Sequence, residues 1–123
     1  MSGKDRVMKM RVDERWLERQ FAYSDRHGIA LPSPEKDWDE LALECQAAIL
    51  SRWETIRGKI PDRIRDLEDA IREKQQLLFE EDDFAQSCLI NGDIADLASR
   101  INDLNIWFRV QQELEPQAKL HIG

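Results

Sequence analysis

The sequence predicts an all-α fold, an antiparallel three-helix bundle with a short N-terminal helix. Apolar residues recur at three- and four-residue spacing along most of the chain, as in amphipathic helices. The 123 residues are 35% charged and include only 5 glycines and 4 prolines, a composition that favours helices with charged outer faces. With 41% hydrophobic residues, a chain of this length supports one core. We therefore expect a single domain over residues 1–123, with 1–12 and 117–123 weakly ordered, and helices at about 13–26, 35–57, 62–80 and 83–115.

The first helix is expected over residues 13–26. Asp13 is a suitable N-cap, and His27-Gly28 supplies a stop because glycine can adopt a positive φ. Residues 29–34 include two prolines, which disfavour helix in the residues before them. This segment is therefore predicted to be an extended connector.

The second helix is expected over residues 35–57. Ser33 followed by Pro34 resembles an N-cap with proline at the first helical position, and Gly58 ends the pattern. Between them, three-and-four spacing gives one apolar face, which we expect to pack beside the following helices. The residues with this spacing are Trp38, Leu41, Cys45, Ala48, Ile49, Arg52, Trp53 and Ile56.

The segments 62–80 and 83–115 are predicted to form an antiparallel helical hairpin that turns at residues 81–83. Pro61 opens the first segment, and Asp82 or Asp83 is the expected N-cap of the second. A turn at Asn91-Gly92 is the alternative, but it would leave four consecutive acidic residues inside a helix. Gly92 then lies within a helix at a cost of about 1 kcal/mol relative to alanine, which marks a weak point or a close neighbour. Pro116 is expected to end the last helix. The seam between the arms is Ile64, Leu67, Ile71, Lys74 and Leu78 against Ser87, Ile90, Ile94, Leu97, Ile101, Leu104 and Phe108.

The residues that usually carry chemistry are scattered, and we expect no catalytic residue, no metal site and no cofactor. His27 lies at a predicted helix end and His121 in the predicted tail, with no Ser-His-Asp set and no glycine-rich phosphate loop. Cys45 and Cys88 are expected to be reduced and buried, because no CxxC pair or disulfide framework is present. One enzymatic alternative is a Mg²⁺-dependent all-α nucleotide hydrolase that uses the helically spaced pairs Glu40 with Glu44 or Asp93 with Asp96.

The charge distribution narrows the class of partner. A net charge of −7 argues against duplex nucleic acid or an anionic membrane as the main partner. Residues 1–30 hold 7 Lys and Arg against 5 Asp and Glu, whereas residues 81–115 hold 2 against 8. The acidic C-terminal part admits a further alternative, an inhibitor that mimics nucleic acid and occupies a basic groove. The sequence also shows no membrane-spanning run and no secretory signal, so we expect a cytoplasmic protein.

Residues 64–97 resemble the UVR motif, a short helical hairpin of the excision-repair proteins UvrB and UvrC and of some Clp-protease regulators. Asp83 and Phe84 match the start of its second arm, Ser87 and Cys88 its two small positions, and Ile94 and Leu97 its apolar end. Asn91 and Gly92 stand where the family has an Arg-Asp pair, and Ala85 replaces an acidic residue. The resemblance implies a hairpin that binds another protein.

These observations favour a non-catalytic protein-protein interaction or regulatory module. Its partner-binding residues are predicted to be Phe84, Gln86, Asn91 and Asp93 near the hairpin turn, with Trp107 at the far end of the last helix. Trp107 and Phe108 are adjacent and cannot both face one seam, so one of them must cover the N-terminal segment or another subunit. A protein partner is expected, and a homodimer is left open as an alternative.

Overall fold

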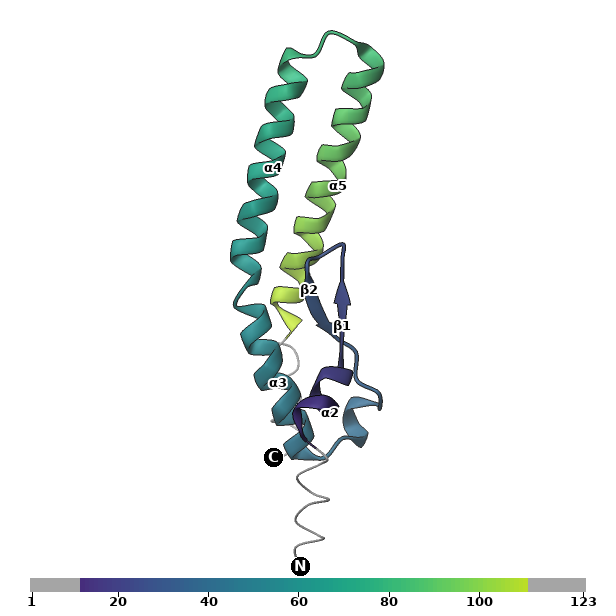
Figure 1. The fold of residues 1–123 in the computed structure, drawn as a ribbon, viewed down its shortest axis with the longest axis vertical. Coiled ribbons are helices and arrows are strands. Elements are labelled where there is room, and N and C mark those ends of the chain that lie inside the picture. Colours follow the sequence, from purple (N-terminus) through teal and green to yellow (C-terminus); the bar gives the residue numbers. More distant parts are fainter. Residues whose placement is uncertain (1–11, 111–123) are drawn as a thin grey trace, which may run out of the picture. The chain divides into compact units, whose positions relative to one another are not determined.

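The structure is a computed structural model that describes residues 12–110, and it is mostly helical with one small sheet (Figure 1). The chain divides into two compact units between Arg57 and Gly58, and each unit is described by itself. Among the described residues, no helix combines the length and the apolar character needed to cross a bilayer. The predictions for residues 1–11, for Pro116 and for the C-terminal tail lie outside this part of the chain.

The N-terminal helix is shorter than predicted, and a β-hairpin follows it. Helix α2 covers Glu14–Arg19, and Asp13 caps it as predicted, with Oδ1 accepting a hydrogen bond from the Trp16 amide at 2.8 Å. Strands β1 (Phe21–Ser24) and β2 (Ile29–Pro32) then pair in antiparallel register. The prediction of helix up to residue 26 is wrong, and the fold is not purely α.

The physical reason lies in the extended segment before Pro32. Residues 29–32 are extended, as predicted, but their backbone amide and carbonyl groups then need hydrogen-bond partners. The preceding aromatic-rich segment provides them by forming a strand. Gly28 has a φ of 74°, and its amide donates to the Ser24 carbonyl at 2.7 Å. The positive φ expected at Gly28 therefore closes a hairpin loop rather than a helix.

The second helix begins later than predicted. Helix α3 covers Leu43–Arg57, and only a 3₁₀ turn, η1 (Trp38–Glu40), precedes it, so the predicted start at Ser33-Pro34 is wrong. The Glu35 amide donates a hydrogen bond to Gln20 Oε1 at 3.0 Å. This bond holds the segment around Glu35 against Gln20, so the segment does not form the predicted first turn of a helix. Of the predicted apolar face, Cys45, Ile49 and Trp53 are buried on α3, whereas Trp38 and Leu41 lie before the helix begins.

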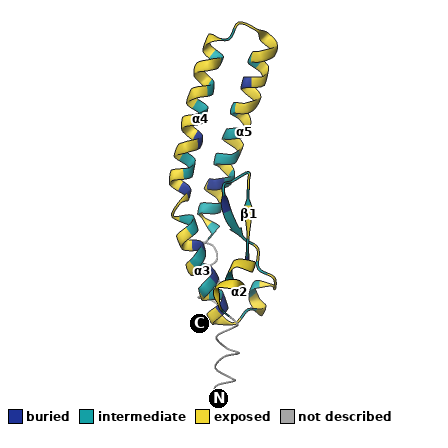
Figure 2. Ribbon diagram, in the orientation of Figure 1, coloured by how far each residue is buried: buried dark blue, intermediate teal, exposed yellow. Residues whose placement is uncertain are grey.

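The second unit is the predicted helical hairpin of α4 (Ile60–Glu80) and α5 (Phe84–Phe108). The arms run antiparallel and pack side by side, the chain turns at residues 81–83, and α5 continues through Asn91 and Gly92, as predicted (Figure 1). Figure 2 shows that most residues of both arms are exposed and that few are buried. The packing of α3 against this pair stays a prediction, and the predicted helix end at 115 lies outside the described residues. The buried residues of the two arms are Ile60, Leu67, Ile90 and Leu104.

Candidate interaction surface

The turn of the α4–α5 hairpin is built from acidic side chains that cap the backbone. Helix α4 ends because Glu81 adopts an extended conformation with φ −85° and ψ 127°. Its Oε2 accepts a hydrogen bond from the Asp83 amide at 3.1 Å. Asp83 Oδ1 in turn accepts from the Ala85 amide at 2.9 Å and the Gln86 amide at 3.4 Å. The predicted N-cap role of Asp83 is confirmed, and two of the acids hold the turn in one conformation.

Large apolar side chains are exposed on both sides of this turn. Phe79, at the end of α4, is 88% exposed, and Phe84, the first residue of α5, is 82% exposed. Leu77 and Leu89 are exposed as well, at 52% and 63%. Exposed leucines are ordinary, but two almost fully exposed phenylalanines within two turns of one hairpin end mark a contact surface.

The two phenylalanines lie on the same face of the hairpin. Antiparallel arms are related by an approximate two-fold axis, so a residue that directly follows a seam position in either arm projects to the same side. Phe79 directly follows Leu78, and Asn91 directly follows Ile90. Phe84 precedes Asn91 by seven residues, two helical turns, and shares its side of α5. We call Phe79, Phe84 and Asn91 the phenylalanine face.

The predicted partner-binding residues are therefore divided between two faces. Gln86 and Asp93 directly precede seam positions, so they lie opposite the phenylalanine face, and Asp93 Oδ2 is 3.1 Å from Lys74 Nζ. Trp107 is half-buried near the far end of α5. Of the five predicted residues, only Phe84 and Asn91 belong to the phenylalanine face. Phe79 was missed, although its place one residue after the seam was a visible signal.

The end of the hairpin is also strongly acidic. From Gln75 to Gly92 the sequence has four acidic residues, Glu80 to Asp83, and no lysine or arginine. The negative charge is thus concentrated at the turn, between the two phenylalanines. An apolar surface with an acidic border suits a partner with an apolar site inside a basic border.

The two cysteines differ in their surroundings. Cys45 is buried, with 8% of its surface exposed, as predicted. Cys88 is exposed, so its predicted burial is wrong. The reason is its helical position, because Cys88 directly follows the seam residue Ser87 and projects to the side of Phe84.

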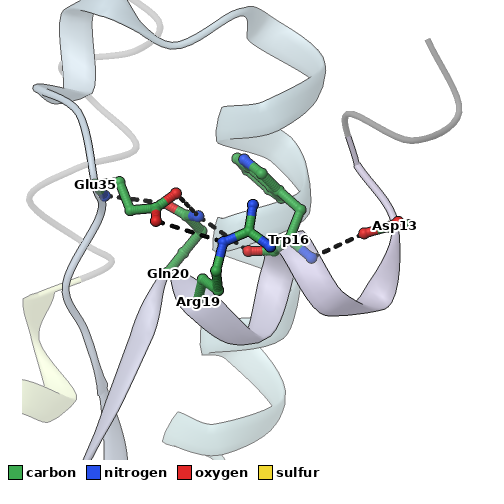
Figure 3. A network of polar contacts seen from close by, with 5 residues as sticks. All are labelled: Asp13, Trp16, Arg19, Gln20 and Glu35. Carbon is green, nitrogen blue, oxygen red and sulfur yellow. Dashed lines mark hydrogen bonds and ion pairs between the residues drawn. The ribbon is translucent and has the colours of Figure 1, made fainter. Parts of the chain in front are cut away.

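The first unit offers a second candidate, a polar network around the fully buried side chain of Gln20 (Figure 3). Gln20 Nε2 donates to the Trp16 carbonyl at 2.9 Å and to Glu35 Oε1 at 3.0 Å, while Arg19 Nε lies 3.4 Å from Glu35 Oε2. The hydrogen bond from Gln20, followed by the charge of Arg19, lowers the pKa of the Glu35 carboxyl below its usual range. The polar groups of Gln20, Glu35 and Arg19 bind one another and the nearby backbone, so the network explains the local fold without a ligand.

An open cavity of about 250 Å³ lies beside this network, lined partly by Trp16, Glu35, Glu40 and Cys45. The predicted pairing of Glu40 with Glu44 on one helical face does not occur, because Glu40 belongs to η1 whereas Glu44 lies in the first turn of α3. Over residues 12–110, no three His, Cys, Asp or Glu side chains are grouped as metal ligands.

Comparison of this chain with known protein families, with curated proteins and with solved structures found no match. Its function is therefore inferred from its own residues.

Proposed function

We propose that this chain is a non-catalytic protein-interaction module and that the phenylalanine face at the hairpin turn is its contact surface. The observation that supports this proposal is the exposure of Phe79 and Phe84, 88% and 82%, on one face of a capped turn. Aromatic side chains at the centre of an interface supply a large share of binding energy because they bury much apolar area. Two phenylalanine side chains exposed to solvent therefore favour a partner protein that buries them.

The hairpin also presents these side chains on a rigid support. The seam residues fix the two arms against each other, and the caps from Glu81 and Asp83 fix the turn. Less conformational entropy is lost on binding when the contact residues lie on an ordered element rather than on a loose loop. The short connection of residues 81–83 therefore suits a docking role.

We further propose that the partner is a protein with an apolar site bordered by lysine or arginine. The four acidic residues of the turn would steer such a partner and set the orientation of the complex. An acidic mimic of nucleic acid would also bind a basic groove, but it would depend on its carboxylates more than on Phe79 and Phe84. The relative cost of removing each group distinguishes the two functions.

The UVR-like pattern of residues 64–97 supports a protein partner as well. In this pattern Asp83 caps the second arm and Phe84 follows it, which agrees with the geometry of the turn. Asn91 belongs to the phenylalanine face and stands at a position where the family has a charged residue. We therefore propose that the partner differs from the partners of that family.

Photo-crosslinking tests the contact surface in the full chain. The photoreactive analogue benzoylphenylalanine replaces Phe79 or Phe84, and the matched control carries it at Leu77, at the same end of the hairpin but on the opposite face. We expect one protein to crosslink at positions 79 and 84 and much less at 77. Equal crosslinking at all three positions would contradict the assignment of the face.

A parallel assay of nucleotide hydrolysis tests the enzymatic alternative. The double variants Glu40→Gln/Glu44→Gln and Asp93→Asn/Asp96→Asn remove the two carboxylate pairs on which that alternative was based. Magnesium-dependent turnover by the wild-type chain that is lost in either double variant, but kept in Phe84→Ala, would favour the hydrolase over the interaction module.

A further inference from the structure

Helix α5 has charged residues on only one of its sides. Each of them directly precedes a seam residue, so all project to the face opposite the phenylalanines. Three of them are held in ion pairs: Asp93 pairs with Lys74 of α4, and Asp96 pairs with Arg100 at 2.8 Å. The charged residues of α5 are Asp93, Asp96, Arg100 and Asp103.

The other side of α5 is exposed but uncharged. It consists of residues that directly follow seam positions, spaced alternately by three and four, and it extends for about 27 Å at 1.5 Å per residue. The corresponding positions on α4 include Arg65, Glu68 and Arg72, so the lack of charge is specific to α5. A water-facing helix side normally carries charged residues. We call this set the uncharged stripe: Cys88, Asn91, Ala95, Ala98, Asn102 and Asn105.

We infer that the uncharged stripe is a self-association surface that binds the same stripe of a second copy of this chain. Alternating three-and-four spacing is the pattern by which two helices pack along their length, and the seam of this hairpin already uses it once. Ala95 and Ala98 at the middle of the stripe permit close approach of two backbones. Asn91 and Asn102 carry donors and acceptors that pair across such an interface. The uncharged stripe lies on the same side of the hairpin as the phenylalanine face and shares Asn91 with it, so self-association and binding of the proposed partner would compete for this side.

The charges of the hairpin assign an antiparallel orientation to the two α5 helices. One end carries the four acidic residues 80–83, and the other end carries Lys59, Arg63 and Arg109 with Asp62. Antiparallel pairing centred on Ala95 places the acidic turn of each copy at the level of the basic end of the other. Parallel pairing would place the acidic residues 80–83 of the two copies side by side, where their negative charges would repel one another. In the antiparallel arrangement Cys88 of one copy lies opposite Asn102 of the second copy.

Sedimentation equilibrium of the full chain tests the self-association. We expect the wild-type chain to show twice the mass of one chain. Ala95→Glu places a charge at the centre of the uncharged stripe and should weaken the dimer by about a hundredfold, because a carboxylate would be buried without a partner. Leu89→Glu adds the same charge to the opposite face of α5 and should leave the dimer intact. A monomeric wild-type chain, or equal effects of the two variants, would overturn the proposal.

Disulfide crosslinking tests the orientation. In Cys45→Ala/Asn102→Cys, oxidation by copper phenanthroline and oxygen should remove one hydrogen from each of two thiols and join Cys88 to the new thiol of the second copy. The two positions are about 21 Å apart within one helix, so they cannot join inside one chain. Cys45→Ala alone should crosslink far more slowly. Equally fast crosslinking of Cys45→Ala, through Cys88 pairs, would indicate parallel helices and overturn the antiparallel assignment.

Discussion

Lys74 and Asp93 are joined across the two arms of the hairpin, with Lys74 Nζ 3.1 Å from Asp93 Oδ2. Lys74 occupies a seam position of α4, and the other seam residues of α4 are apolar. Its side chain is 37% exposed and that of Asp93 57% exposed, so the aliphatic stem covers the seam while the ammonium group reaches water and the carboxylate. The charge is therefore accommodated without burial.

The stability of the hairpin should increase when Lys74 is replaced by an apolar residue. An ion pair as exposed as this one contributes about 0–1 kcal/mol, and Lys74→Met replaces it with apolar contact in the seam. We expect the free energy of unfolding in urea to rise by about 0.5–1 kcal/mol. Asp93→Ala, which removes only the ion pair, should lower it by less than about 1 kcal/mol. A loss of several kcal/mol in either variant would mean that the pair is essential to the fold.

Gly92→Ala should stabilise the chain. Gly92 lies inside α5, and a Cβ atom added there would meet nothing within 4 Å beyond its chain neighbours and the backbone of its own helical turns. Of the two predicted explanations, a weak point or a close neighbour, the structure supports the weak point. Better helix propensity should raise the free energy of unfolding by about 0.5–1 kcal/mol, measured in urea. Ala95→Gly, the reverse change on the same helix, should lower it by a similar amount, and destabilisation by Gly92→Ala would contradict this account.

The stability of the first unit should fall in acid through Glu35. The pKa of Glu35 is below its ordinary value of 4.5 because Gln20 donates to the carboxylate and Arg19 lies beside it. A pKa lower in the folded than in the unfolded chain adds stability above the unfolded value, and this stability is lost as the pH falls through the folded value. NMR titration should place the Glu35 pKa below 4.5, and Arg19→Gln should raise it. Titration of Glu35 above 4.5 would contradict the network.

The two cysteines should react at very different rates. Cys88 is exposed on α5, whereas Cys45 lies on the buried face of α3, so a maleimide should label Cys88 quickly and Cys45 only when the chain opens. Mass spectrometry after brief labelling should find one modification, on the peptide that holds Cys88. Rapid labelling of both thiols would show that the first unit is open at Cys45.

The hairpin could be predicted from the sequence because local and long-range signals agree there. The seam spacing, Pro61 at the start of α4 and the acidic cap at Asp83 all indicate the same helix boundaries. The segment before α3 could not be predicted in this way. Its conformation depends on Gln20, which lies fifteen residues before Glu35 and binds both its amide and its carboxylate. Such a tertiary hydrogen bond leaves no periodic pattern, so the Ser33-Pro34 start signal was misleading.

The contact surface was predicted only in part for a related reason. Phe84 was identified from its place at the turn, but Phe79 belongs to the preceding arm and shares a face with Phe84 only after the chain reverses. Cys88 was expected in the core, but it directly follows the seam residue Ser87 and is exposed, as is Phe84 on the same side of α5. The helical phase relative to the seam, rather than closeness in sequence, determines which side chains face water.

The affinity of the crosslinked partner for four variants tests the central claim most directly. Calorimetry with the purified partner compares Phe79→Ala and Phe84→Ala with the controls Leu77→Ala and Leu89→Ala, whose fold is verified by circular dichroism. Loss of an aromatic anchor costs about 2 kcal/mol, so each phenylalanine variant should bind about 30-fold more weakly, while the controls stay close to wild type. Wild-type affinity in both phenylalanine variants would contradict the claim that the phenylalanine face is the contact surface.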